Sequence, residues 1–123
     1  MGPAPDKGRS PDELLAEVYR EFRDGLAGRV EALRATLERL AGGYDASAAD
    51  TFYRTAHTLK GTAASFEADE LVEPAKGLAE VGLRWLEGGD FDPLEVAAAF
   101  RQLEELEGGV QRYMERVEGD ALG

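Results

Sequence analysis

The chain contains a single histidine, His57, and Lys60 and Gly61 follow it one helical turn later. A free imidazole has a pKa of about 6.5, so near neutral pH it presents an unprotonated nitrogen that can react as a nucleophile without help from a base. A lysine one turn away in a helix lies on the same side of it. The candidate chemistry is therefore nucleophilic attack by the imidazole, with the lysine supplying a nearby positive charge.

The segment around His57 is predicted to be a helix whose two faces differ. A helix turns by about 100° per residue, and at that angle the apolar residues of this segment fall within one stripe, or meridian, along its surface. These residues are Phe52, Ala56, Leu59, Ala63 and Phe66. His57 lies roughly 140° from that meridian, so we predict that its ring points to solvent. Lys60 and Gly61 bracket the same outer face, which also holds Tyr53 and Ala64. Glycine costs a helix about 1 kcal/mol relative to alanine, which indicates that a side chain at position 61 would obstruct a close approach to His57.

The stretch AHTLKGTAASF resembles the phosphorylation segment of histidine-containing phosphotransfer domains, including the amino-terminal domains of chemotaxis histidine kinases. Their pattern is His, two residues, Lys, Gly, then small residues and an aromatic residue. The resemblance is detailed from Phe52 to Leu71, and it extends to the whole chain in length, helix order and acidic character. It implies that His57 is the phosphoacceptor and Lys60 the cation near the phosphoryl group. It also implies that Gly61 leaves a gap beside the ring and that Phe66 is the core aromatic residue.

Two positions depart from that family pattern. Members usually have glycine directly after the aromatic residue, whereas this chain has Glu67, so we expect the turn into the next helix to be made differently. Kinase-linked members often present a carboxylate from the third helix toward the histidine. Ungapped counting puts Ala79 there, with Glu80 displaced by about 100° around the helix. This second departure argues against docking to a kinase of the chemotaxis type.

A long first helix must support this segment. Ser10 is its predicted N-cap, with Pro11 at the first helical position and Glu13 completing a capping box. Residues 42–43, both glycine, are expected to end it, and residues 25–28 are where it would bend or split. Its predicted core stripe consists of Leu15, Val18, Phe22, Leu26, Arg29 or Val30, Leu33, Leu37 and Leu40.

The second helix is predicted for residues 48–66, with Ser47 as N-cap and Asp50 as a short capping-box partner. The third is predicted to start after Asp69, although Pro74 is also compatible with a later start. Its core candidates are Leu71, Val72, Ala75, Leu78, Val81 or Gly82, and Trp85.

The fourth helix is predicted to begin with Asp92 as N-cap and Pro93 at its first position, and glycines at 108–109 weaken its middle. Its inward residues are predicted to be Val96, Phe100, Leu103, Leu106, Val110, Tyr113 and Val117. Short connections between these elements predict an all-α fold, an up-and-down antiparallel four-helix bundle.

Composition narrows the kind of protein. The chain has 123 residues, 43% of them hydrophobic, which suits one domain. We predict a bundle over residues 10–118, a flexible lead over residues 1–9 and a tail over residues 119–123. The net charge of −11 disfavours nucleic acid and anionic membrane surfaces as partners.

Other residue counts exclude several kinds of chemistry and suggest a compartment. The chain has no cysteine, which rules out disulfides and thiolate chemistry. Neither a signal-peptide core nor a run of about 18 apolar residues is present, so we expect a cytoplasmic protein. We predict no metal site and no cofactor, because the acidic residues Glu38, Glu104, Glu105 and Glu107 follow no ligand spacing and are expected to form a solvated face.

The sequence thus predicts a phosphorelay intermediate of two-component signalling, which is a phosphoacceptor and not an enzyme in itself. His57 would accept a phosphoryl group from a histidine kinase or a receiver aspartate and pass it to a response-regulator receiver. Partner contacts would come from Tyr53, Arg54, Gly61 and Ala64, and the chain would be a monomer.

Four alternatives stay open at this point. One is a non-catalytic helical module that binds a protein partner through the same face. Another is a phosphotransfer domain excised from a chemotaxis-type histidine kinase. A dimer through the first helix is weaker, because the bundle core explains that helix's stripe. An enzyme acting on a small substrate is least favoured, because no second acid, base or nucleophile accompanies His57.

Overall fold

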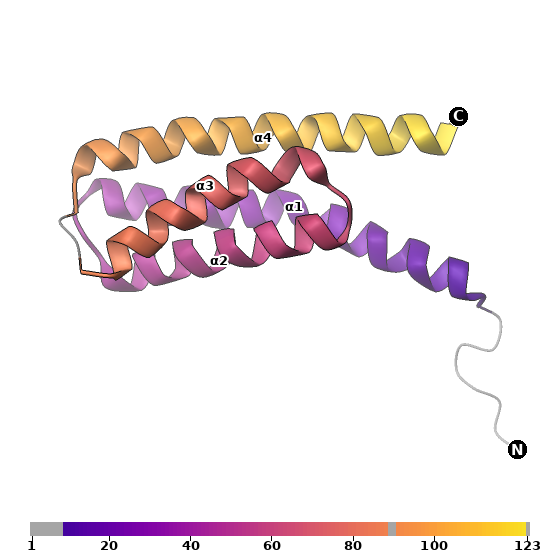
Figure 1. The fold of residues 1–123 in the computed structure, drawn as a ribbon, viewed down its shortest axis with the longest axis horizontal. Coiled ribbons are helices and arrows are strands. Elements are labelled where there is room, and N and C mark those ends of the chain that lie inside the picture. Colours follow the sequence, from indigo (N-terminus) through magenta and orange to yellow (C-terminus); the bar gives the residue numbers. More distant parts are fainter. Residues whose placement is uncertain (1–8, 89–90, 123) are drawn as a thin grey trace, which may run out of the picture.

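In the computed structural model, residues 9–88 and 91–122 are described, with side chains as far as residue 120. Four helices run alternately up and down: α1 (Pro11–Ala41), α2 (Ala46–Ser65), α3 (Asp69–Leu86) and α4 (Pro93–Leu122). Each packs against two neighbours, so that α1 contacts α2, α2 contacts α3, α3 contacts α4, and α4 contacts α1 (Figure 1). The predicted all-α, antiparallel four-helix bundle is confirmed.

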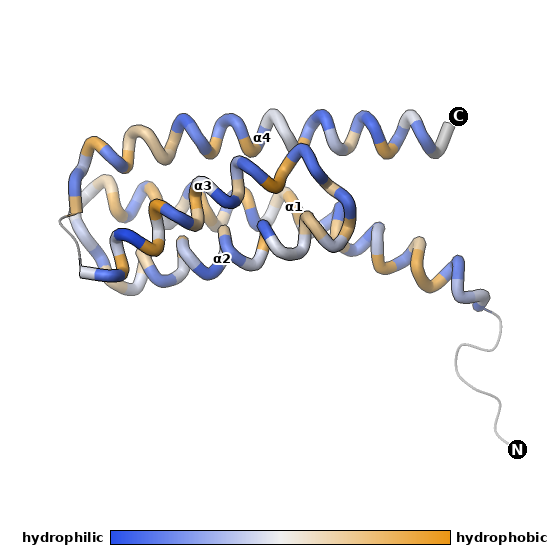
Figure 2. The backbone as a smooth tube through the Cα atoms, viewed as in Figure 1, coloured by the Kyte–Doolittle hydropathy of each residue, from blue (hydrophilic) through white to orange (hydrophobic). Residues whose placement is uncertain are grey.

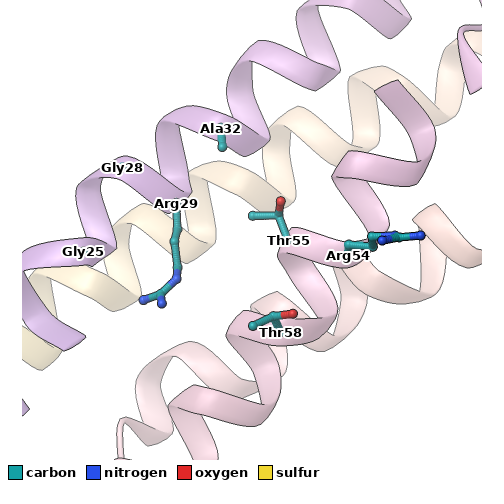
Figure 3. Close-up of a pocket in the computed structure, with 7 residues that line it drawn as sticks. All are labelled: Gly25, Gly28, Arg29, Ala32, Arg54, Thr55 and Thr58. Carbon is teal, nitrogen blue, oxygen red and sulfur yellow. The ribbon is translucent and has the colours of Figure 1, made fainter. Parts of the chain in front are cut away.

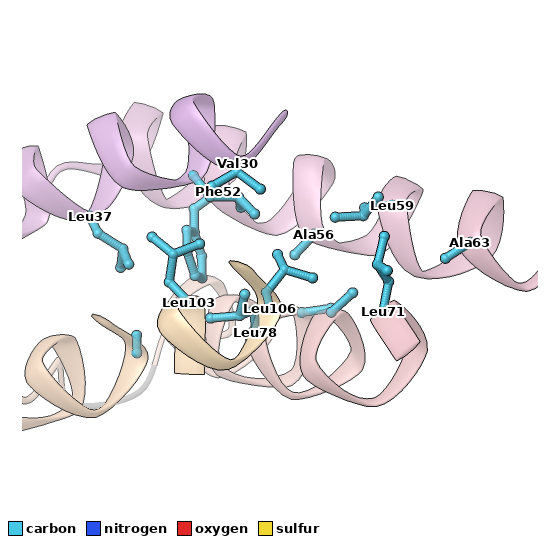
Figure 4. Close-up of a cluster of buried hydrophobic side chains, with 14 of the residues drawn as sticks. Val30, Leu37, Phe52, Ala56, Leu59, Ala63, Leu71, Leu78, Leu103 and Leu106 are labelled. Carbon is cyan, nitrogen blue, oxygen red and sulfur yellow. The ribbon is translucent and has the colours of Figure 1, made fainter. Parts of the chain in front are cut away.

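The core is assembled from one face of each helix. Apolar residues recur along all four helices between hydrophilic ones (Figure 2), and side chains from every helix meet in the interior (Figure 4). Burying a leucine or phenylalanine contributes about 1.5–3 kcal/mol relative to leaving it exposed. The largest side chains buried to below 2% exposure are Tyr113, Phe52, Leu26, Leu33, Leu37, Leu40, Leu59, Leu71, Leu78, Leu103 and Leu106.

Helix α1 begins with the predicted N-cap, because the Ser10 hydroxyl accepts a hydrogen bond of 3.1 Å from the Glu13 amide. The predicted capping box is not completed, because the Glu13 carboxylate accepts from the Ser10 hydroxyl, at 3.4 Å, instead of from the Ser10 amide. The helix is continuous through residues 25–28, so of the bend or split predicted there, the split is excluded. The core stripe is confirmed from Phe22 to Leu40, with Val30 and not Arg29 in the buried position. The prediction is wrong for the first two residues of the stripe, because Leu15 and Val18 are 55% and 45% exposed.

The exposure of those two residues follows from where α1 lies. Its first turns extend beyond the connection between α2 and α3, away from the other helices (Figure 1). A helical stripe is buried only where another element lies alongside it. The apolar period therefore predicted the correct face of α1 but not the level at which the bundle begins.

The start of α2 corrects the predicted N-cap. Asp45, not Ser47, caps the helix, and its carboxylate accepts a hydrogen bond of 3.0 Å from the Ala48 amide. That bond, together with the ion pair that Asp45 forms with Arg39, holds the pKa of Asp45 below its ordinary value. Asp50 does not complete a capping box, because its carboxylate binds Arg54 one turn later.

The connection between α2 and α3 is a tight turn whose central residue is Glu67. This residue has φ +56°, in the left-handed region that glycine adopts at least cost. The Ala68 amide donates to the Ala63 carbonyl at 2.8 Å and the Glu67 amide to the Ala64 carbonyl at 3.2 Å, which is the Schellman pattern. The expectation of a different turn is thus corrected: a glutamate adopts the conformation for which glycine is the usual residue.

An arginine from α4 secures this turn. Arg116 binds both carboxylate oxygens of Glu70, at 2.7 and 3.0 Å, and also donates to the Glu67 carbonyl at 2.9 Å. The hydrogen bonds from Arg116 hold the pKa of Glu70 below its usual range. The end of α2 is thereby tied to the last turns of α4.

Helix α3 begins at Asp69 with Pro74 inside it, so the earlier of the two predicted starts is correct. Proline lacks an amide hydrogen, which leaves the Glu70 carbonyl without its usual partner in the helix. Gly109 of α4 lies against that carbonyl, and an added Cβ there would come within 2.5 Å of it. Gly109 therefore permits a close approach of α3 and α4, and α4 continues through it without a break.

Helix α4 starts as predicted, with the Asp92 carboxylate accepting a hydrogen bond of 2.9 Å from the Leu94 amide. Its inward face is confirmed: Val96, Leu103, Leu106 and Tyr113 are buried, and Phe100, Val110 and Val117 are half-buried. The helix runs through Leu122, past the predicted limit at residue 118.

The predicted flexible lead over residues 1–9 stays a prediction, because residues 1–8 lie outside the described part of the chain, as does residue 123 of the predicted tail. None of the helices described is both long and apolar enough to cross a membrane.

Candidate functional site

Helix α2 presents two faces of different character, as the sequence predicted. Phe52, Ala56, Leu59 and Ala63 have no exposed surface, whereas His57 is exposed on the opposite side. Phe66 caps the helix and is half-buried, with its ring stacked on Phe22 at 4.6 Å between centroids. The inner face anchors α2 in the core, and the outer face carries the imidazole.

The neighbour of His57 on this outer face is Tyr53. The two rings are stacked, with centroids 5.5 Å apart and an angle of 26° between their planes. Tyr53 is half-buried and packs against the core, and Gly82 of α3 lies directly behind it. A Cβ added to Gly82 would come within 3.0 Å of the Tyr53 Cα and Cβ atoms. Tyr53 is therefore held between the body of the bundle and the exposed imidazole.

Four other predicted site residues share this side of α2. Lys60 is half-buried, and Gly61 and Ala64 are exposed. Arg54 is 75% exposed and pairs with Asp50 at 3.0 Å. A Cβ added to Gly61 would meet nothing within 4 Å, so no contact inside the chain requires glycine there. The structure thus brings all six predicted site residues together on one face, with small residues flanking the histidine.

No carboxylate of α3 engages His57. Gly82 is level with Tyr53, so one turn further along the antiparallel pair brings Ala79 level with His57. Ala79 is 5% exposed, and Glu80 faces solvent. Within the described residues, His57 forms neither a hydrogen bond nor an ion pair with another side chain. Its ring nitrogens are therefore not occupied by another side chain of the described residues.

A groove between α1 and α2 borders the same face, and sequence reasoning missed it (Figure 3). It encloses about 470 Å³ and is lined by Gly25, Gly28, Arg29, Ala32, Arg54, Thr55 and Thr58. The Arg29 guanidinium lies 6.0 Å from the centroid of the Phe22 ring, and its Nη1 is buried without a hydrogen-bond partner. The available signal was the charged residue beside Val30 in an otherwise apolar stripe.

The acidic residues of the bundle do not converge on a metal site. In the part of the chain that the structure describes, no three side chains of the ligating types come together. Glu38, Glu104 and Glu105 are exposed, as predicted for a solvated face. That prediction is wrong for Glu107, which is half-buried and forms an ion pair with Arg34 at 2.6 Å. That hydrogen bond raises the pKa of Arg34 above its ordinary value.

Comparison with protein families resolves what this bundle is. The family model described as the Hpt domain matches residues 17–118, which covers most of the chain and includes the whole outer face around His57. The chain belongs to the Hpt domain family. Hpt domains are phosphotransfer modules of two-component signalling, so this bundle is one too. No curated protein and no solved structure matched the chain.

For an Hpt domain, the arrangement of α2 has a direct chemical meaning. Phosphoryl transfer is governed mainly by in-line positioning and by nearby positive charge, and little covalent assistance is needed. A rigid helix that presents one accessible imidazole suits in-line positioning. A half-buried lysine one turn away suits the requirement for nearby positive charge.

Proposed function

We propose that His57 is the phosphoacceptor of this Hpt domain and that the chain is a phosphorelay intermediate. The observation that carries the proposal is the exposed, unpaired imidazole on the outer face of α2, inside the segment matched to the family. The phosphoryl group would come from a histidine kinase or a receiver aspartate and would leave to the aspartate of another receiver domain.

The transfer step needs few groups from this chain. The unprotonated ring nitrogen of His57 attacks phosphorus and forms the N–P bond, while the P–O bond to the donor aspartate, or the P–N bond to the donor histidine, breaks. The donor side chain keeps the bonding electron pair, and a donor histidine also takes up a proton so that it leaves as neutral imidazole. The proton on the other ring nitrogen of His57 is released to solvent. Lys60 offsets the charge that builds on the equatorial phosphoryl oxygens.

The partner would dock on the face formed by Tyr53, Arg54, Gly61 and Ala64. Glycine at position 61 is not needed by the free chain, so a partner that must come close to His57 is the reason we assign to it. The receiver or kinase would supply the metal ion and most of the catalytic groups. The bundle would act as a monomer whose folded core holds the histidine in place.

The test is phosphoryl transfer from a panel of autophosphorylated histidine kinases and phosphorylated receiver domains, with wild type compared with His57→Gln. We expect label on the wild type only, lost in acid and retained in base, as a phosphohistidine requires. The free energy of unfolding should change by less than about 0.5 kcal/mol, because the ring is outside the core.

Two other outcomes would point elsewhere. A glutamine variant labelled as strongly as wild type would rule out His57 as the acceptor. A receiver that binds both proteins equally well, with label on neither, would favour a helical interaction module without phosphoryl chemistry.

A further inference from the structure

Resting on the proposed role of His57, we propose that Tyr53 is a positioning residue for phosphoryl transfer, which holds the imidazole by one face and leaves its edge free. The stacked rings, 5.5 Å apart and 26° from parallel, are the observation behind this inference. The two residues are four apart in one helix, so their side chains are neighbours on its surface.

Stacking suits this task because of where the reactive electrons lie. The lone pair of an imidazole nitrogen is in the plane of the ring, and it leaves from the edge. A neighbour that covers a face restricts rotation of the ring without blocking that edge. An ordinary hydrogen bond to a ring nitrogen would also hold the ring, but it would occupy one of the two atoms that take part in the transfer.

Tyr53 can hold the imidazole because Tyr53 is itself held. Its ring packs against the hydrophobic core, and Gly82 of α3 approaches its Cα and Cβ atoms so closely that no larger residue fits without a shift. Within the described residues, His57 forms no hydrogen bond or ion pair with another side chain, so no polar contact restrains its ring. The path of restraint therefore runs from α3 through Tyr53 to the acceptor ring.

The experiment uses the full chain with Tyr53→Phe, which keeps the aromatic ring, and Tyr53→Leu, which keeps apolar bulk but removes the ring. Phosphoramidate serves as a chemical phosphoryl donor, since it needs no protein docking. We expect Tyr53→Leu to slow labelling of His57 by about three- to tenfold, which is the range that one aromatic pair provides. Tyr53→Phe should stay within about twofold of wild type.

Nuclear magnetic resonance gives a second readout that a merely structural role would not move. With one histidine in the chain, its two ring C–H signals are unambiguous. The Tyr53 ring current should shift them in wild type and in Tyr53→Phe, and the shift should vanish in Tyr53→Leu. Tyr19→Leu is the matched control, because Tyr19 is also half-buried but contacts Phe66 instead of His57. It should leave both readouts unchanged.

The proposal is overturned if folded Tyr53→Leu is labelled at the wild-type rate, or if Tyr53→Phe is slowed as much as Tyr53→Leu. Failure of the proposed function looks different. In that case phosphoramidate would not label His57 in the wild type, while the ring signals would still report whether the two rings are stacked.

Discussion

The inner and outer faces of α2 are built from one helix but are expected to serve different purposes. Residues on the inner face, such as Leu59, have no exposed surface and are enclosed by the other helices. His57, two residues earlier, is exposed, and the residues beside it are small or polar. The comparison teaches that one helix can carry a residue that stabilises the fold and a residue proposed to react about 200° apart around its axis. Substitutions on the inner face should therefore change the stability of the fold and leave the labelling of His57 unchanged.

The largest effect on stability is expected from the inner face. Leu59→Ala should lower the free energy of unfolding by about 2–5 kcal/mol, because it removes buried methyl groups and leaves a cavity among packed helices. Urea denaturation followed by circular dichroism measures this loss. At low urea, where the variant is still folded, phosphoramidate should label His57 at nearly the wild-type rate. A large loss of labelling in the folded variant would show that the two faces are not independent.

A smaller change, with opposite effects on the two properties, is expected at Gly61. Gly61→Ala should stabilise the bundle by about 1 kcal/mol, since alanine favours the helix and its Cβ meets nothing. If a partner needs that space, transfer to a receiver domain should become slower, while labelling by phosphoramidate should not.

Gly119→Ala on α4 is the control for Gly61→Ala. Position 119 is another exposed helical position where an added Cβ meets nothing, and α4 does not pack against α2. This variant should gain some stability, less than Gly61→Ala because it lies in the last turn of α4, without slowing transfer. Unchanged receiver transfer in Gly61→Ala would remove the docking role assigned to that glycine.

The smallest effect is expected where α2 ends. Glu67→Gly should raise the free energy of unfolding by about 0.5–1 kcal/mol, because relief of the left-handed strain, about 1–2 kcal/mol, exceeds the entropy that glycine loses on folding. Thermal and urea unfolding would measure the gain. Since Glu67 lies at the end of the helix, labelling of His57 should not change. A destabilised variant would mean that the glutamate side chain contributes contacts that outweigh the strain.

Much of this fold could be predicted from local sequence signals. The Ser10 cap, the Asp92 cap and the apolar period of each helix depend on residues within one or two turns of each other, and the structure confirms them. The N-cap of α2 was missed because Ser47 and Asp45 are both good caps two residues apart. The ion pair between Asp45 and Arg39, near the end of α1, favours Asp45 over Ser47 as the N-cap, and it depends on how α1 packs.

Longer-range features were harder to predict. Leu15 and Val18 continue a regular stripe but are exposed. The first turns of α1 diverge from the other helices, and a single sequence gives no measure of how far apart two helices lie (Figure 1). Gly109 was predicted to weaken the middle of its helix, and Gly82 was one of two alternatives for a core position. Both are the positions where another backbone comes closest, which depends on how helices distant in sequence are paired.

By itself, the sequence determined which residues of α2 face outward, because the helical period sets the direction of every side chain from its position alone. It also determined which residue is the candidate phosphoacceptor, since only one imidazole is present. Tyr53 lies one turn from His57 in the same helix, so the helical period also makes their side chains neighbours. Only the tertiary structure decided that Tyr53 is fixed against Gly82 and that Arg29 lines a groove between α1 and α2. Both features require two helices at a defined distance and register, and packing of the whole core sets both.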